Sequence, residues 1–141
     1  MSVVEYHTSD GIAYVKLNRP EKNNPLNRAV FDRLEDIWDD FCTDDDAHVA
    51  ILYGAGENFS TGFDLGEEIG ALDEFNEEEI RRKNVDSSAG GLVRGKRIHK
   101  PVIAAIEGWC LAGSFETALA CDLRVASETA KFGLYHVREG M

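Results

Sequence analysis

The six residues at 111–116, LAGSFE, constrain the fold of this chain more than any other segment. They end an apolar run and begin a predicted helix, with a glycine at the junction and a carboxylate in the first turn. The first N–H groups of a helix lack partners within the helix and carry partial positive charge, so such a junction stabilises negative charge that develops on a carbonyl oxygen. Because Gly113 has no side chain, a ligand can approach its backbone closely. We therefore interpret the junction as a candidate oxyanion site, with Glu116 as its acid or base.

A second glycine-containing turn lies upstream at residues 58–65, NFSTGFDL, after an apolar run of its own. We expect one of its N–H groups to be the second donor, because an oxyanion hole aims two donors at one oxygen. The alternative for Gly62 and Gly113 is an ordinary turn or helix-end glycine. For Glu116, the alternative is a carboxylate on the solvent-facing side of the helix.

Length, net charge and cysteine spacing exclude several classes of function for this chain. The chain has 141 residues, enough for one domain with its own core, and a formal net charge of −11 from 26 acidic and 15 basic residues. Such a charge repels polyanions, so nucleic acid and anionic membranes are not expected partners. No apolar run approaches the roughly 20 residues that span a bilayer. Cys42, Cys110 and Cys121 form no CxxC motif, which predicts neither a zinc site nor disulfides but reduced thiols in the cytoplasm.

The hydrophobic pattern predicts alternating strands and helices. Residues 3–9 and 12–17 are β-branched runs joined by Asp10 and Gly11, a strong hairpin signal. Apolar residues recur at helical spacing over 26–41, which predicts an amphipathic helix. The other expected elements are strands at 49–53, 102–106, 123–126 and 132–135 and helices at 92–99 and 114–121. This succession is typical of an α/β layered fold.

Five sequence blocks resemble the crotonase (enoyl-CoA hydratase/isomerase) superfamily in order and spacing. They are LNRP at 17–20, NPLN at 24–27, FSTGFDL at 59–65, KPVIAAIEG at 100–108 and CDLR at 121–124. The resemblance implies a spiral of ββα units, with residues 1–141 forming a single N-terminal domain that stops before a C-terminal helical trimerisation region. It also implies an acyl-CoA thioester substrate, a homotrimer or a dimer of trimers for the full-length protein, no metal, and no cofactor beyond the coenzyme A of the substrate.

The same resemblance assigns roles to individual residues. The oxyanion-hole donors are the N–H groups of Phe63 and Gly113, and Glu116 holds and activates water. The residues expected to bind substrate are Lys22, Pro25 and Leu26 toward the nucleotide end of coenzyme A, and Gly62, Asp64, Leu65 and Ala112 along the pocket.

One catalytic position departs from the family pattern. The second glutamate of the hydratases falls at His136 in this chain. Histidine transfers protons near neutral pH, so a pair of Glu116 and His136 is chemically reasonable. The alternatives are an ordinary exposed histidine and a substitute carboxylate at Glu139. The histidine at this position argues against hydration by a pair of glutamates, and it argues equally against double-bond isomerisation.

Two charged clusters have competing interpretations. The acidic residues at 73–79, followed by bases at 81–83, predict a surface helix rather than a metal site, because no histidine accompanies them. The densest basic cluster is Arg94, Lys96, Arg97 and Lys100, which either binds the phosphates of coenzyme A or forms a solvated helix face.

The function predicted from the sequence is addition of water to a 2-enoyl-CoA. An isomerase, hydrolase or decarboxylase on the same scaffold is the alternative within enzymes. A catalytically inactive coenzyme A-binding fragment is the alternative outside them.

Overall fold

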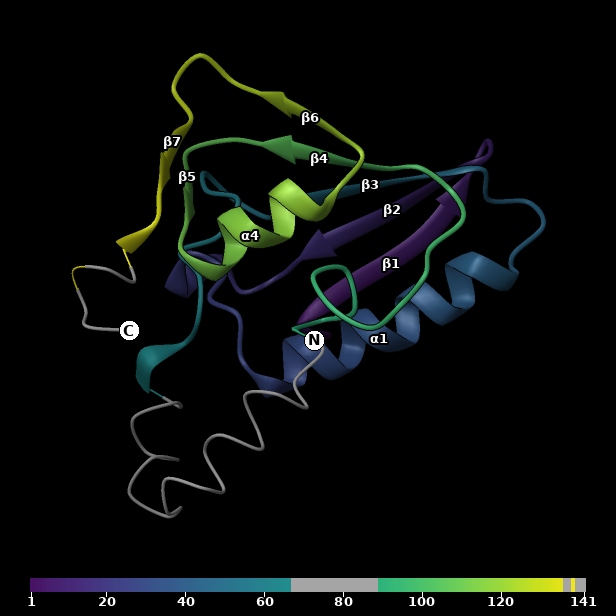
Figure 1. Ribbon diagram of the computed structural model, residues 1–141, viewed down its shortest axis with the longest axis horizontal. Coiled ribbons are helices and arrows are strands. Elements are labelled where there is room, and N and C mark those ends of the chain that lie inside the picture. The colour runs from purple at the N-terminus through teal and green to yellow at the C-terminus, as the bar shows by residue number, and fades with distance from the viewer. Residues whose placement is uncertain (67–88, 136–137, 139–141) are drawn as a thin grey trace.

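The computed structural model describes residues 1–66, 89–135 and 138, and a five-stranded mixed sheet forms its centre (Figure 1). The strand order is β1-β2-β3-β4-β6, with β1 and β2 antiparallel and the other neighbours parallel. These strands are β1 (Val4–Ser9), β2 (Ile12–Leu17), β3 (Val49–Gly54), β4 (Val102–Ile106) and β6 (Leu123–Ala126). The architecture is the α/β arrangement that the sequence predicts.

A second, two-stranded parallel sheet pairs β5 (Trp109–Leu111) with β7 (Lys131–Gly133). The helical elements that lie wholly within the described ranges are the short 3-10 helix η1 (Pro20–Lys22) and the α-helices α1 (Arg28–Thr43) and α4 (Gly113–Ala120). None of the described helices is long and apolar enough to cross a membrane.

The β1–β2 hairpin forms where the sequence places it. Asp10 and Gly11 have φ values of 51° and 81°, and Ser9 pairs directly with Ile12. Positive φ at both central residues of a two-residue loop is the requirement of a type I′ turn, whose twist matches that of the flanking strands.

Helix α1 packs its apolar stripe against β1 and β2. Asn27 caps the helix, since its side-chain oxygen accepts a 3.0 Å hydrogen bond from Val30 N. The buried stripe consists of Val30, Leu34, Ile37, Trp38 and Phe41. The indole N–H of Trp38 also donates to Gly90 O at 2.9 Å, which ties the helix to the segment after residue 88.

The predicted helix at 92–99 is wrong. Residues 91–95 form turns and 96–99 are irregular, because Gly91 and Gly95 have φ values of 86° and 93°, outside helical geometry. Lys96 donates to Glu35 O, and Lys100 donates to Phe41 O and Asp44 O, so both ammonium groups bind carbonyls of α1 or just beyond its end. The basic cluster therefore holds a helix in place through these two lysines. The predicted helix at 73–79 lies outside the described residues.

The smaller sheet was only partly predicted. The last strand is expected at 132–135 and found at Lys131–Gly133, whereas β5 was not expected. Strand β5 has three residues and forms through pairing with β7 and a single bridge from Ser60 to Cys110, so its sequence carries too little pattern to identify it.

We predict that Trp38→Phe lowers the free energy of unfolding by about 2 kcal/mol, because it leaves a cavity and removes the hydrogen bond to Gly90 O. Trp109→Phe is the matched control, since Trp109 is 44% exposed, and it should cost less than about 0.5 kcal/mol. Urea denaturation of both variants checks this, and equal costs would contradict the packing described here.

Candidate active site

The two glycine-containing turns lie in direct contact. A Cβ built on Gly62 would lie 2.7 Å from Leu111 O and 3.3 Å from Gly113 N. Gly62 has a φ of 91°, so both its conformation and its surroundings require glycine. The structure therefore brings together the two segments that the sequence nominates for the oxyanion site.

Leu26, in the segment before α1, forms a backbone bridge with Phe63. Leu26 N donates to Gly62 O at 2.7 Å and Asp64 N donates to Leu26 O at 2.9 Å, in a parallel bridge between Leu26 and Phe63. Because backbone N–H directions alternate along an extended chain, the N–H of Phe63 points away from Leu26. The Phe63 ring covers Gly113, where an added Cβ would meet its Cζ at 2.7 Å.

Gly113 is the first residue of α4, so its N–H has no partner within the helix. In the part of the chain that the structure describes, no acceptor for this N–H is found. The preceding residue, Ala112, has φ 51° and ψ −124°, a conformation that L-residues rarely adopt. Its carbonyl accepts from Phe115 N and Glu116 N, and its own N–H donates to Gly133 O at 2.7 Å. These bonds hold the entry to α4 in a fixed, strained geometry.

Ser114 locks the two turns together, a role that sequence reasoning missed. Its buried hydroxyl lies 2.9 Å from Ser60 O and 2.7 Å from Leu111 O, and it accepts from Leu111 N at 3.0 Å. The Ser60 hydroxyl in turn accepts from Gly62 N at 3.1 Å. A serine after a glycine is so common that the sequence around Ser114 does not reveal these hydrogen bonds.

The acid/base candidates are less enclosed. The Glu116 side chain is exposed in the first turn of α4. A solvent-facing carboxylate is the alternative interpretation that the sequence leaves open for this residue. The pocket candidate Leu65 is 44% exposed. His136 and Glu139 lie outside the described residues. Within the described ranges, no three His, Cys, Asp or Glu side chains are grouped closely enough to hold a metal ion.

The three residues expected near the nucleotide differ in exposure. Lys22 is exposed at the end of η1, whereas Pro25 and Leu26 are buried. The contribution of Leu26 that the structure shows is its backbone, which holds Gly62 and Asp64. A cavity of about 220 Å³ opens next to η1 and is lined by Pro20, Asn23, Ala55, Gly56, Glu57 and Asn58.

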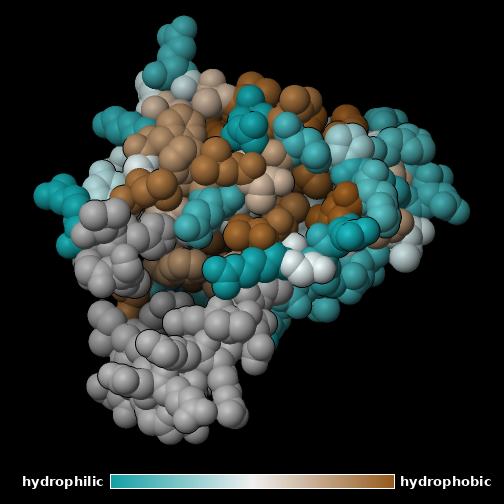
Figure 2. Space-filling model, in the orientation of Figure 1, coloured by the Kyte–Doolittle hydropathy of each residue, from teal (hydrophilic) through white to brown (hydrophobic). Residues whose placement is uncertain are grey.

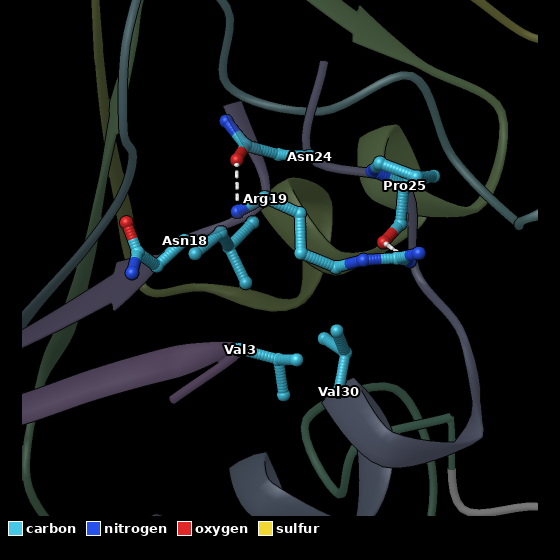
Figure 3. Close-up of a pocket in the computed structure, with 7 residues that line it drawn as sticks. Val3, Asn18, Arg19, Asn24, Pro25 and Val30 are labelled. Carbon is cyan, nitrogen blue, oxygen red and sulfur yellow. Dashed lines mark hydrogen bonds between the residues drawn. The ribbon is translucent and has the colours of Figure 1, made fainter. Parts of the chain in front are cut away.

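Arg19 and Asn24 connect the loops behind Phe63, and sequence reasoning missed both. Figure 3 shows the Arg19 side chain extending past Pro25, whose carbonyl accepts from its Nη1 at 2.9 Å, while Arg19 N donates to Asn24 Oδ1 at 2.9 Å. Asn24 is 1% exposed and donates to Ala55 O and Asn58 O. The depression around Arg19 leaves essentially no room for a water molecule.

The cysteines near the site are not nucleophiles at neutral pH. Burial raises the pKa of the Cys110 thiol to about 11 and that of Cys121 to about 12. Cys42 is half-buried, and all three cysteines are free.

Comparison with known proteins identifies the class to which this fold and pair of turns belong. The model of the enoyl-CoA hydratase/isomerase family matches residues 7–141. The chain therefore belongs to the enoyl-CoA hydratase/isomerase family, which confirms the resemblance seen in the sequence.

Individual relatives share this assignment. The chain is 40% identical over 130 residues to mevalonyl-coenzyme A hydratase sidH of Aspergillus fumigatus, covering 92% of this chain and 46% of that protein. It is 37% identical to a hydroxycinnamoyl-CoA hydratase-lyase of Pseudomonas fluorescens, covering 98% of this chain and 50% of that protein. A crystal structure of an enoyl-CoA hydratase/isomerase from Xanthobacter autotrophicus Py2 matches with a TM-score of 0.90 and 35% identity, over 99% of this chain and 51% of that one. The chain thus spans about half the length of the relatives it matches.

We predict that Gly62→Ala lowers the free energy of unfolding by about 2 kcal/mol or more, because alanine is strained at this φ and collides with the Leu111 carbonyl. Gly66→Ala is the control, since a Cβ there meets only Asp64 Oδ1 at 3.4 Å, an ordinary contact. Urea denaturation measures both changes. A Gly62→Ala protein as stable as the control would show that the two turns do not touch.

A pH prediction follows from the buried thiols. Because folding raises their pKa above the ordinary 9.0, their stabilisation is complete below pH 9 and is lost as pH rises toward 11 and 12. The free energy of unfolding should therefore fall more steeply above pH 9 in the wild type than in a Cys110→Ala/Cys121→Ala variant. Urea titrations at pH 8 and pH 10 test this, and parallel losses would contradict it.

Proposed function

We propose that this protein binds an acyl-CoA thioester and catalyses the addition of water to a 2-enoyl-CoA. The observation that carries the proposal is the contact between the Gly62 turn and the start of α4, the two segments that hold the Phe63 and Gly113 amides. The family match and the relatives named as hydratases support it.

In this proposal the two amides bind the thioester oxygen. When the oxygen of water bonds to C3 of the enoyl group, the double bond shifts and negative charge collects on the thioester oxygen as an enolate. Protonation at C2 then completes the addition, with the elements of water balanced. Donors that bind the enolate oxygen more strongly than the ground-state carbonyl lower the barrier, by about 3 kcal/mol per donor.

Glu116 is the proposed group that takes the proton from water. It stands in the first turn of α4, three residues after Gly113, on the same helix end as the donor. We propose His136 as the assisting proton-transfer group in place of the second glutamate of the hydratases, with Gly62, Ala112, Asp64 and Leu65 lining the pocket and Lys22, Pro25 and Leu26 toward the nucleotide. No metal or further cofactor is required by this chemistry.

Assembly and location are also proposals. We propose a homotrimer or a dimer of trimers, as the family resemblance implies, in the cytoplasm, where free cysteines persist. Figure 2 shows apolar residues gathered over the part of the molecule that contains α4 and β5 to β7, and such a surface is suited to contact with further polypeptide. The exposed large hydrophobic residues of these elements are Trp109 in β5, Leu119 in α4, Leu123 and Val125 in β6, and Phe132 in β7.

We predict that the protein hydrates crotonyl-CoA and that Glu116→Gln lowers kcat by about 100-fold or more, because general acid–base catalysis contributes that much. Glu128→Gln, an exposed glutamate outside the site, is the control and should leave kcat unchanged. Loss of enoyl absorbance measures turnover, and mass analysis of the product distinguishes hydration from isomerisation or thioester hydrolysis. An unchanged spectrum with the wild type would favour the inactive coenzyme A-binding alternative.

A further inference from the structure

We propose that Arg19 and Asp64 form a positioning pair for the Phe63 amide, and that Arg19 also neutralises a carboxylate that would otherwise oppose the oxyanion. The inference deepens the proposed function and rests on it for the role of that amide. It adds a residue, Arg19, that lies far from the site in sequence and whose side chain is 10% exposed.

Arg19 contacts both segments that flank Phe63. Its Nη2 lies 2.9 Å from Asp64 Oδ2, directly after Phe63, and its Nη1 donates to Pro25 O, directly before Leu26. Leu26 is the residue whose backbone brackets Phe63 through hydrogen bonds to Gly62 and Asp64. One guanidinium therefore fixes the spacing between the two segments joined by the Leu26–Phe63 bridge, which orients the Phe63 N–H.

The second guanidinium contact is an ion pair rather than an aligned hydrogen bond. Asp64 Oδ2 is buried, and Arg19 Nη2 lies 2.9 Å from it. Within the described residues, however, no donor has the geometry of a hydrogen bond to this oxygen. The Asp64 side chain is only 14% exposed. A buried carboxylate oxygen with so little hydrogen bonding depends on the nearby positive charge of Arg19.

The position of this carboxylate matters for chemistry. Asp64 follows the proposed donor by one residue, so its charge lies on the order of 10 Å or less from an oxygen bound at the Phe63 amide. Two negative charges at that separation repel, and the repulsion grows as the thioester becomes an enolate. Arg19 cancels the Asp64 charge, so the pair preserves the geometry without opposing the reaction.

This proposal predicts that substitutions of Arg19 and of Asp64 lower kcat by different amounts. Asp64→Asn removes the ion pair but also the negative charge, whereas Arg19→Gln leaves the carboxylate unpaired beside the oxyanion. We expect kcat to fall about tenfold in Asp64→Asn and about 100-fold in Arg19→Gln, with KM changed less than about threefold in both. Adding Asp64→Asn to Arg19→Gln should raise kcat back to the level of Asp64→Asn alone. Arg19→Lys, which keeps the charge but loses the fork, should lie between wild type and Arg19→Gln.

The control is Asp32→Asn, which removes an exposed Arg–Asp pair, Arg28 with Asp32, on α1. It should change neither kcat nor KM. If the Arg19→Gln/Asp64→Asn double variant is as slow as Arg19→Gln, the charge-neutralising role is wrong. If the losses in kcat of all variants follow only their losses in unfolding free energy, Arg19 acts as a scaffold and the proposal is overturned.

A ligand-free measurement separates this inference from the proposed function. Amide hydrogen exchange at Leu26 and at residue 64 should accelerate at least about tenfold in Arg19→Gln, while the β1–β2 hairpin amides stay unchanged. Unchanged exchange at both positions overturns the positioning role whatever the activity. The second measurement is the frequency of the thioester C=O stretch of bound butyryl-CoA. If this frequency is not lowered in the wild-type complex, the proposed function is refuted. If that stretch is lowered in the wild type and equally in Arg19→Gln, only the present inference fails.

Discussion

The candidate site depends on one close approach between two backbones. Gly62 lies so near Leu111 O and Gly113 N that no side chain fits between them, and its left-handed conformation excludes other residues independently. Around this contact, Ser114 binds carbonyls from both turns and the Phe63 ring closes over Gly113. The site is therefore built largely from main-chain groups, whose positions are fixed by the fold rather than by flexible side chains.

This construction suits the anionic acyl-CoA substrate that we propose for this acidic protein. With a net charge of −11, the chain as a whole does not attract an anion such as coenzyme A, so the proposed binding requires local, directed donors. The basic residues that the sequence offers for this purpose are partly committed elsewhere, since Lys96 and Lys100 bind carbonyls of α1 and the turn after it. Arg19 is likewise used internally, between Pro25 and Asp64. The family match gives the scaffold, and the acid/base residues decide the reaction on it.

Patterns that arise from local physics were predictable from the sequence. The type I′ hairpin follows from Asp10 and Gly11, and α1 follows from its apolar stripe with Asn27 as cap. The sequence also pairs the two glycine turns, because each follows an apolar run, and the structure places them in contact. Family motifs, rather than periodicity, supplied their chemical role.

What the sequence did not reveal depends on contacts between distant residues. Strand β5 exists through its pairing with β7, and residues 91–100 are shaped by positive φ glycines and by lysines that reach α1. The roles of Asn24 and Ser114 arise from hydrogen bonds that cross the fold, to Asn58 and to Ser60. No local pattern encodes such bonds, because the partner's position is set only once the sheet has formed.

A crystal structure of the protein with butyryl-CoA, which is saturated and does not react, tests the central claim most directly. The account predicts that the thioester oxygen lies within about 3.1 Å of both the Phe63 and the Gly113 nitrogens. A thioester oxygen that contacts only one of these nitrogens, or a ligand bound elsewhere, would contradict it.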